Sequence, residues 1–297
     1  MMTVEHLREC PVCGNQSFSN WMTCTDFLVS KKEFTIQSCE QCGFKATNPR
    51  PVEAEIGQYY QSEDYISHSD TRQGIISQLY HSVRKITLQQ KVKLITSLSP
   101  RKGELLDIGC GSGYFLEASQ EAGWKITGTE PDANTRQQAF QRTSVPLKKS
   151  IFELNDDQPY DVITMWHVLE HVHELSETLE WIRSHSRQNG HLVIAVPNYH
   201  SWDAQHYKPF WAAYDVPRHL YHFSPDVMKT LLKRYGFELK EQRPMLFDAF
   251  YVNMLSTKNR DGKPAYLESF WNGIRSNWAA YQDGGNYSSL IYVAQAQ

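Results

Sequence analysis

Long apolar runs are missing from this sequence of 297 residues. The longest, LVIAVP at residues 192–197, is far shorter than the roughly 20 residues that cross a bilayer as a helix. The first residues, MMTVEHLREC, lack the apolar core of a signal peptide and contain acidic side chains, which transit peptides avoid. We therefore expect a cytoplasmic protein with no membrane partner.

A strong excess of either charge is also missing. The 30 Lys and Arg residues and 33 Asp and Glu residues give a formal charge of −3. Because no basic excess is present to attract phosphates, we do not expect nucleic acid as a partner. A hydrophobic content of 40% is ordinary for a globular protein, and the length allows one large domain with a small appended module.

Cysteine is rare after residue 42, since five of the six cysteines lie within the first 42 residues. CPVCG at 10–14 and CEQCG at 39–43 are two C-x-x-C-G turns, which in a reducing compartment indicate a metal site rather than disulfides. Four thiolates fill the tetrahedral shell of a structural zinc ion and leave no open position for catalysis. We predict a zinc ribbon over residues 1–48, with the ligands Cys10, Cys13, Cys39 and Cys42.

A proline- and tyrosine-rich connector follows at 49–73, and from residue 74 helical and strand-like segments alternate to residue 297. Strands are expected at ELLDIG, WKITGTE, YDVITMW, HLVIAVPN and SLIYVAQA. This alternation predicts an α/β domain with a doubly wound, mostly parallel sheet. Within it, residues 199–224 are expected to form a lid or acceptor loop, and residues 262–286 an insertion before the last strand.

The first strand runs into a glycine-rich turn, LLDIGCGSGYF at residues 105–115. A dinucleotide-binding loop needs G-x-G-x-x-G, but here the third glycine comes one residue early and Tyr114 stands in its place. Asp107 would repel a pyrophosphate, whereas it suits a ligand with an ammonium group. Glu130, at the end of the second strand, could accept both ribose hydroxyl protons. These features favour S-adenosylmethionine, which carries an ammonium and a sulfonium and no phosphate.

These residues resemble the class I S-adenosylmethionine-dependent methyltransferases. DIGCGSG is similar to the family's acid followed by G-x-G-x-G, YDVITMWHVLEHV to its fourth strand, and PRHLYHFSPDVMKTLLKRYGFEL to its segment before a late helix. The resemblance covers about residues 75–297 and implies a Rossmann-like fold and methyl transfer. The candidate cofactor-binding residues are Asp107, Gly109, Cys110, Gly111, Tyr114, Phe115, Glu130, Pro131, Ile151, Phe152, Met165, Trp166 and His167.

One part of the family pattern is missing. Members often have an acid after the third strand that binds adenine, and this sequence has Ser150 followed by Ile151 and Phe152 at that place. We therefore expect adenine to be held by apolar contacts and by backbone or Ser150 hydrogen bonds. The N-terminal half is also similar to bacterial methyltransferases that carry a zinc-binding module, some of which act on sugars.

Methyl transfer to a hydroxyl or carbon acceptor needs a general base, most often His or a carboxylate. We expect the base after the fourth or fifth strand, with the candidates His219, His222, His167 and Tyr221. The leading hypothesis is O- or C-methylation of a small-molecule or glycosyl acceptor. An RNA methyltransferase that uses the ribbon as reader, a non-catalytic module that binds S-adenosylmethionine, and an NAD(P) oxidoreductase are alternatives. The sequence predicts no oligomeric state.

Overall fold

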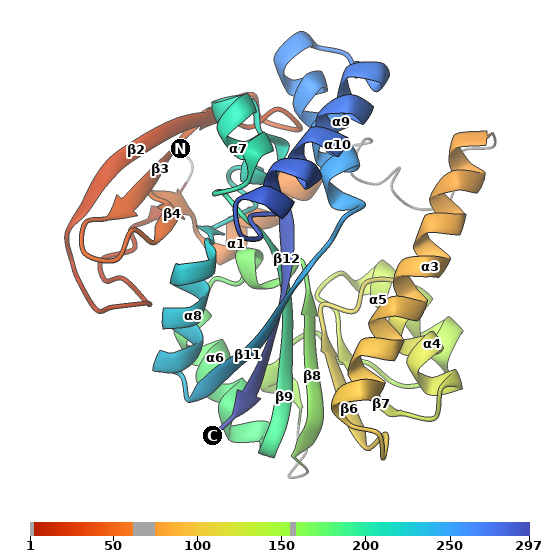
Figure 1. Cartoon of the computed structure of the whole chain (residues 1–297). Helices are drawn as coiled ribbons and strands as arrows, with labels where there is room; N and C mark the ends of the chain where they lie inside the picture. The colour runs from red at the N-terminus through yellow and green to blue at the C-terminus, as the bar shows by residue number, and fades with distance from the viewer. Residues whose placement is uncertain (1–2, 62–74, 155–158) are drawn as a thin grey trace.

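A computed structural model describes residues 3–61, 75–154 and 159–297 (Figure 1). Its main sheet has six strands in the order β11-β12-β9-β8-β6-β7. Four of them, β6 to β9, are mutually parallel, and β12 runs antiparallel to both of its neighbours. The strands are β6 (Glu104–Ile108), β7 (Lys125–Thr129), β8 (Tyr160–Trp166), β9 (Ser186–Pro197), β11 (Phe237–Pro244) and β12 (Ser289–Ala296). The predicted mostly parallel α/β sheet is confirmed.

Helices cover both faces of this sheet. One face packs against α3 (Ile75–Leu98) and α4 (Tyr114–Glu121), through a cluster that includes Leu105, Val162 and Val193. The other face packs against α6 (Leu175–His185) and α8 (Pro225–Arg234), through a cluster that includes Leu106, Ile163 and Leu192. Successive strand residues point to opposite faces, and both faces are covered, so the central strands are apolar at nearly every position. Helix α5 (Ala133–Thr143) packs beside α4.

The N-terminal segment forms a curved antiparallel sheet beside the main one (Figure 1). Its strands are β2 (Phe18–Thr25), β3 (Glu33–Cys39) and β4 (Lys45–Thr47), and its fourth strand is β10 (Tyr221–His222), in the order β10-β4-β3-β2. The strand β10 comes from the predicted acceptor loop, so the N-terminal module and that loop share one sheet. A short pair joins β1 (Val4–Glu5), before this sheet in the chain, to β5 (Arg50–Pro51), after β4, and the helix α1 (Glu53–Ile56) comes next. The connector from residue 62 to 73 lies outside the described residues.

The predicted acceptor loop is ordered into short helices, α7 (Trp202–Tyr207), η4 (Lys208–Phe210) and η5 (Ala212–Tyr214). They pack against a helical pair, α9 (Asp248–Asp261) and α10 (Tyr266–Gln282), which lies beyond the carboxyl ends of the parallel strands (Figure 1). Sequence analysis placed an insertion at 262–286 and did not predict α9. Across the ranges described, none of the helices combines the length and apolar character that a membrane crossing requires.

Candidate active site and cysteine cluster

The glycine turn after β6 adopts a backbone that few other residues could replace. Gly109 has a φ of 68° and Gly113 a φ of 82°. A Cβ at Gly109 would lie 2.5 Å from Val168 Cγ2, and a Cβ at Gly113 would lie 2.9 Å from Ala139 Cα. Side chains at Gly109 and Gly113 would therefore clash with their neighbours. No atom lies within 4 Å of a Cβ placed at Gly111. The turn thus combines tight packing beneath it with an open surface at its middle.

Two carboxylates lie at the ends of neighbouring strands beside this turn. Asp107 is buried, and its Oδ1 accepts a 2.6 Å hydrogen bond from the Thr164 hydroxyl. Burial raises the pKa of Asp107 to about 7. Glu130 accepts 3.0 Å hydrogen bonds from the backbone N–H groups of Gly111 and Asp132, and burial raises its pKa as well. Carboxylates that resist ionisation in this way favour a cationic ligand and disfavour a phosphate.

The other predicted cofactor residues occupy different depths. Phe115, Ile151 and Met165 are buried. Phe152 is 51% exposed, and Pro131 is exposed as well. Cys110 is nearly buried, and the Tyr114 ring stacks under Arg142, whose Cζ lies 3.6 Å from its centroid. Whether these residues contact a cofactor stays a prediction.

Sequence analysis missed Lys91, which lies in helix α3. Its Nζ lies 4.2 Å from the centroid of the Trp166 ring, and burial lowers its pKa while the charge of Asp107 opposes that shift. Trp166 also packs against Phe115, and its Nε1 is buried without a hydrogen-bond partner within the described residues. An amphipathic helix far from the motifs gives no signal that one of its lysines reaches the glycine turn.

His167 directly follows β8 and has a φ of 58°, which is rare for a residue with a side chain. Its ring lies between two acids, with Nε2 at 3.0 Å from Asp248 Oδ2 and Nδ1 at 3.4 Å from Glu170 Oε1. Burial alone would lower the pKa of His167, but the two carboxylates outweigh it and raise the pKa to about 10. The ring is therefore protonated at neutral pH, and it forms a hydrogen bond with Asp248 and an ion pair with Glu170.

A second polar group lies next to it and consists of Glu170, His171 and His219. One nitrogen of each histidine and one carboxylate oxygen of Glu170 lie within 4.8 Å of one another. The two rings meet edge to face, with 4.6 Å between their centroids. The Nδ1 of His171 lies 3.0 Å from the Arg218 carbonyl oxygen, and the Nδ1 of His219 lies 2.8 Å from that of Ala213. A carbonyl only accepts, so each Nδ1 carries the proton and each Nε2 can accept one.

Glu170 is the buried member of this group. It is 1% exposed, and neither of its oxygens accepts a hydrogen bond from a described residue. Burial opposes its ionisation, but the contact with His167 keeps the pKa of Glu170 below its ordinary value. Burial and the neighbouring His219 lower the pKa of His171 to about 4, so His171 is neutral at pH 7. A buried carboxylate facing two imidazoles can stabilise a proton or a cation between them.

The predicted residues His222 and Tyr221 are held by the N-terminal module. His222 is buried, its Nε2 lies 3.3 Å from the Thr47 hydroxyl, and burial lowers its pKa well below the ordinary value. The Tyr221 hydroxyl accepts a 2.7 Å hydrogen bond from Arg50 and donates to the His173 carbonyl at 3.0 Å. Together with His219 they border one small void, and their side-chain hydrogen bonds go to Thr47, Arg50 and the His173 carbonyl rather than to Glu170.

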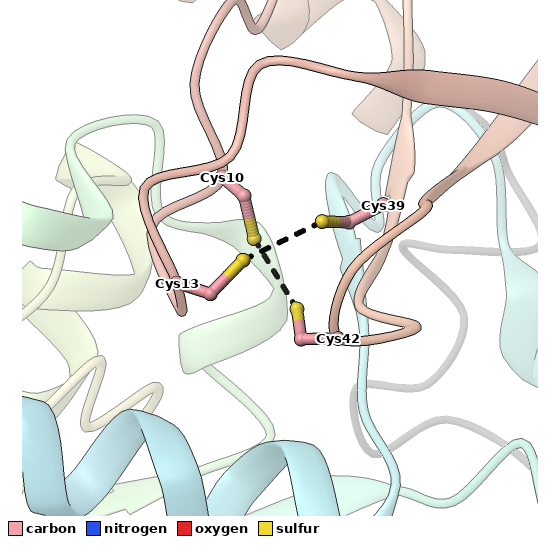
Figure 2. A group of neighbouring side chains, drawn as sticks. All are labelled: Cys10, Cys13, Cys39 and Cys42. Carbon is pink, nitrogen blue, oxygen red and sulfur yellow. Dashed lines mark hydrogen bonds between the residues drawn. The ribbon is translucent and has the colours of Figure 1, made fainter.

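The four cysteines of the paired turns come together, with their sulfurs pointing toward one another (Figure 2). The Sγ atoms of Cys10 and Cys42 are 3.5 Å apart, and those of Cys13 and Cys39 are 3.6 Å apart. Thiolates at about 2.3 Å from a tetrahedral zinc ion would be roughly 3.8 Å apart. Asn15 donates a 3.6 Å hydrogen bond to Cys39, a contact that orients a ligand sulfur. The arrangement fits zinc, which stays a proposal.

Arg218 connects this module to the acceptor loop. Its guanidinium donates to Asp215 at 2.7 and 2.9 Å, to Asp26 at 3.0 Å and to the Tyr59 carbonyl at 2.8 Å. Arg218 is 1% and Asp26 0% exposed. His219 follows directly in the chain, and its backbone N–H donates to the Asp215 carbonyl at 3.0 Å. The position of His219 therefore depends on a buried ion-pair network that spans both parts of the protein.

Comparison with known proteins places this geometry in a family. A family model described as a methyltransferase domain matches residues 80–242, which is more than half of the chain. The ubiquinone biosynthesis O-methyltransferase of Rickettsia canadensis is 24% identical over 188 residues, which cover 57% of this chain and 78% of that protein. The protein of the same name from Rickettsia felis is 25% identical over 185 residues, covering 57% and 75%.

The fold is also similar to that of a solved structure. Magnesium protoporphyrin IX methyltransferase from Synechocystis, crystallised with bound S-adenosylhomocysteine, matches with a TM-score of 0.54 at 14% identity, over 82% of this chain and 100% of that one. Similarity at this identity concerns the fold, whereas the family model and the curated relatives concern the sequence itself. The chain therefore belongs to the class I S-adenosylmethionine-dependent methyltransferases, as its glycine turn and strand-end acids predict.

Proposed function

We propose that the enzyme methylates a hydroxyl oxygen of a small-molecule or glycosyl acceptor. The observation that carries the proposal is the group formed by Glu170, His171 and His219, in which two half-buried imidazoles face a buried carboxylate at the end of β8. A hydroxyl must lose its proton during methyl transfer, and this group is built to receive one. Curated relatives that are named O-methyltransferases support the same atom type.

The residues around the glycine turn fit S-adenosylmethionine. In our proposal Asp107 binds its ammonium group, Glu130 binds its ribose hydroxyls, and the open space at Gly111 admits its chain. When bound, the cofactor supplies a methyl group on a positively charged sulfur. The protein contributes mainly by aligning the acceptor with that methyl group and by excluding water.

His219 is the proposed general base. Its Nδ1 is fixed on the Ala213 carbonyl, so its Nε2 takes the acceptor proton. Glu170 lies beside it and stabilises the imidazolium that forms, as a carboxylate does for a catalytic histidine. His167 is already protonated by its contact with Asp248, so we assign it the positioning of Glu170 rather than proton removal.

The zinc module has a structural part in this proposal. Thr47 donates from its hydroxyl to the His219 carbonyl at 2.7 Å and from its N–H to the Leu220 carbonyl at 3.0 Å. The pairing of β4 with β10 continues this contact along the chain. We propose that the zinc-bound module holds the acceptor loop in the position that catalysis needs, and that it does not bind RNA.

The test is methyl transfer from labelled S-adenosylmethionine to a panel of phenols, sugar hydroxyls, amines and RNA. We expect label in hydroxyl acceptors. His219→Gln should lower kcat roughly 100-fold or more while S-adenosylhomocysteine still binds. His191→Gln, a change in β9 of the main sheet away from the acceptor loop, should leave kcat unchanged and serves as the control. Label that enters only RNA or amines would refute the proposal.

The same three donors are of the types that divalent cations bind, so the base and a metal must be told apart. Titration with Mn²⁺, followed by the loss of its free paramagnetic resonance signal, makes this distinction. The proposal of a base expects no binding at this group and full activity in metal-depleted buffer. If the wild type binds one Mn²⁺ and His219→Gln does not, the group is a metal site and the assignment of His219 as the base is wrong.

A further inference from the structure

The helix α10 is amphipathic, but its polar side is buried and its apolar side is exposed. The residues that it buries are small or polar, namely Ser269, Asn272, Gly273, Ser276 and Ala280. Its large apolar residues are exposed to between 39% and 81%, namely Tyr266, Leu267, Phe270, Trp271, Ile274, Trp278 and Tyr281. At 100° per residue these exposed residues fall within an arc of about 140° on one side of the helix. We call this arc the aromatic face.

Close and specific contacts fix this orientation. Asn272 donates to the Tyr207 hydroxyl at 2.9 Å, and Ser276 donates to Asp203 at 2.9 Å. A Cβ at Gly273 would lie 2.6 Å from the Phe250 ring, so the small residue permits the close approach of α9. The helix thus packs on the protein through its polar side. These contacts fix the helix so that the aromatic face points outward.

The size of the aromatic face exceeds what a monomer usually leaves in water. With about 150–250 Å² for a large side chain, the observed exposures amount to roughly 800 Å². The largest apolar patch of a typical monomer is about 300–600 Å², whereas one side of a standard protein interface buries about 800 Å². Trp, Tyr and Phe are also the residues that dominate interface centres. We propose that this face binds a second copy of the same chain, with two α10 helices packed antiparallel.

The charges at the edge of the arc are self-complementary in that arrangement. Glu268 and Arg275 lie on the same edge of the aromatic face, near positions 200° and 180° on the helix if Tyr266 is at about 0°. A two-fold axis perpendicular to the helix, near Trp271, brings this edge of one copy against the same edge of the other in reversed order. Glu268 of each copy then lies opposite Arg275 of the other, while its carboxylate also accepts 3.0 Å hydrogen bonds from Arg260 of its own chain. No charged residue lies within the arc itself.

The test is sedimentation velocity of the full chain over a range of concentrations. We expect a dimer of twice the 34.4 kDa chain mass. Trp271→Lys places two charges near the symmetry axis and should raise the dimer dissociation constant at least 30-fold. Phe140→Lys, at a residue that is 41% exposed on α5, is the matched control and should leave it unchanged. Both changed residues are exposed, so folding, checked by circular dichroism, should be retained.

Arg275→Glu tests the pairing itself and should weaken the dimer at low salt, because it sets two acids against each other across the axis. Adding Glu268→Gln should recover part of the affinity, since it removes one acid of each facing pair without placing a second cation beside Arg260. A wild type that stays monomeric at every concentration overturns the proposal, as does a dimer that Trp271→Lys leaves intact. A monomer that floats with phosphatidylcholine vesicles through Trp271 would instead assign the face to a lipid surface. None of these results depends on methyltransferase activity, so the proposed function is tested separately.

Discussion

Replacing Arg218 should destabilise the protein more than any surface ion pair does. The change Arg218→Leu removes the hydrogen bonds to Asp215, Asp26 and the Tyr59 carbonyl and leaves two acids without their cation. Breaking a buried pair by removing one partner costs about 3–5 kcal/mol. Asp26 keeps three backbone N–H donors, those of residues 28 to 30, so the lower end of this range applies.

A loss of about 3 kcal/mol corresponds to a fall in Tm of roughly 6–12 °C for a chain of this size. Thermal unfolding followed by fluorescence measures it. The control is Arg187→Leu, because Arg187 is 47% exposed and pairs with Asp161 at 3.1 Å. An exposed pair is worth about 1 kcal/mol or less, so that variant should lose no more than roughly 2–4 °C. Equal losses in the two variants would refute the reasoning.

Arg218→Leu should affect catalysis and cofactor binding differently. His219 adjoins Arg218, whereas Asp107 lies in β6 and Glu130 directly follows β7. Arg218→Leu should therefore lower kcat at a temperature where the variant is folded, yet leave the affinity for S-adenosylhomocysteine unchanged. In a double-mutant cycle with Asp26→Asn, the combined loss of stability should be smaller than the sum of the single losses, because both changes remove the same contact. Additive losses of stability would show that Arg218 does not stabilise the protein through its contact with Asp26.

Two further predictions concern the cofactor and the metal. Burial raises the pKa of Asp107 to about 7, so the ionised form that binds an ammonium group is lost below that pH. Calorimetry should therefore show that the affinity for S-adenosylhomocysteine rises from pH 6 to pH 8. The same shift makes the unliganded protein lose stability as the pH rises from about 4, the ordinary pKa of an aspartate, to about 7. Asp107→Asn should abolish both trends, and a variant that keeps them would exclude this carboxyl. Elemental analysis should find one zinc ion per chain, lost in Cys39→Ser and kept in Cys24→Ser, and zinc kept in both would contradict a four-thiolate site.

The features predicted best from sequence are those that depend on local pattern. The strands β8 and β12 coincide with the apolar runs YDVITMW and SLIYVAQA, because strands covered on both faces must be apolar throughout. The cysteine turns and the acids at strand ends are also local, since a fixed spacing sets which atoms can meet. These patterns were sufficient to identify the fold and the cofactor class.

Features that depend on distant contacts were missed. Helix α9 buries Asn253, Ser256 and Thr257, so it has no apolar periodicity to detect. The edge strand β11, FELKEQRP, is charged along much of its length because one side of it faces solvent. Asp248 meets His167 across 81 positions of sequence. The run HVLEHV could have suggested that Glu170 belongs to a polar site, because an acid between histidines after a parallel strand lies where ligands bind.

The loop at residues 199–224, the predicted acceptor loop, connects the N-terminal module to the rest of the protein. The loop has no sheet of its own, and its strand β10 pairs only with β4 of the module among the described strands. Its other supports include Arg218, which is anchored on Asp26, and Ser256 of α9, which accepts a 2.9 Å hydrogen bond from the Ala212 N–H. A base must be held within a fraction of an ångström to act, and short helices alone do not supply that rigidity. In our proposal zinc therefore acts on catalysis indirectly, by fixing the sheet that positions His219.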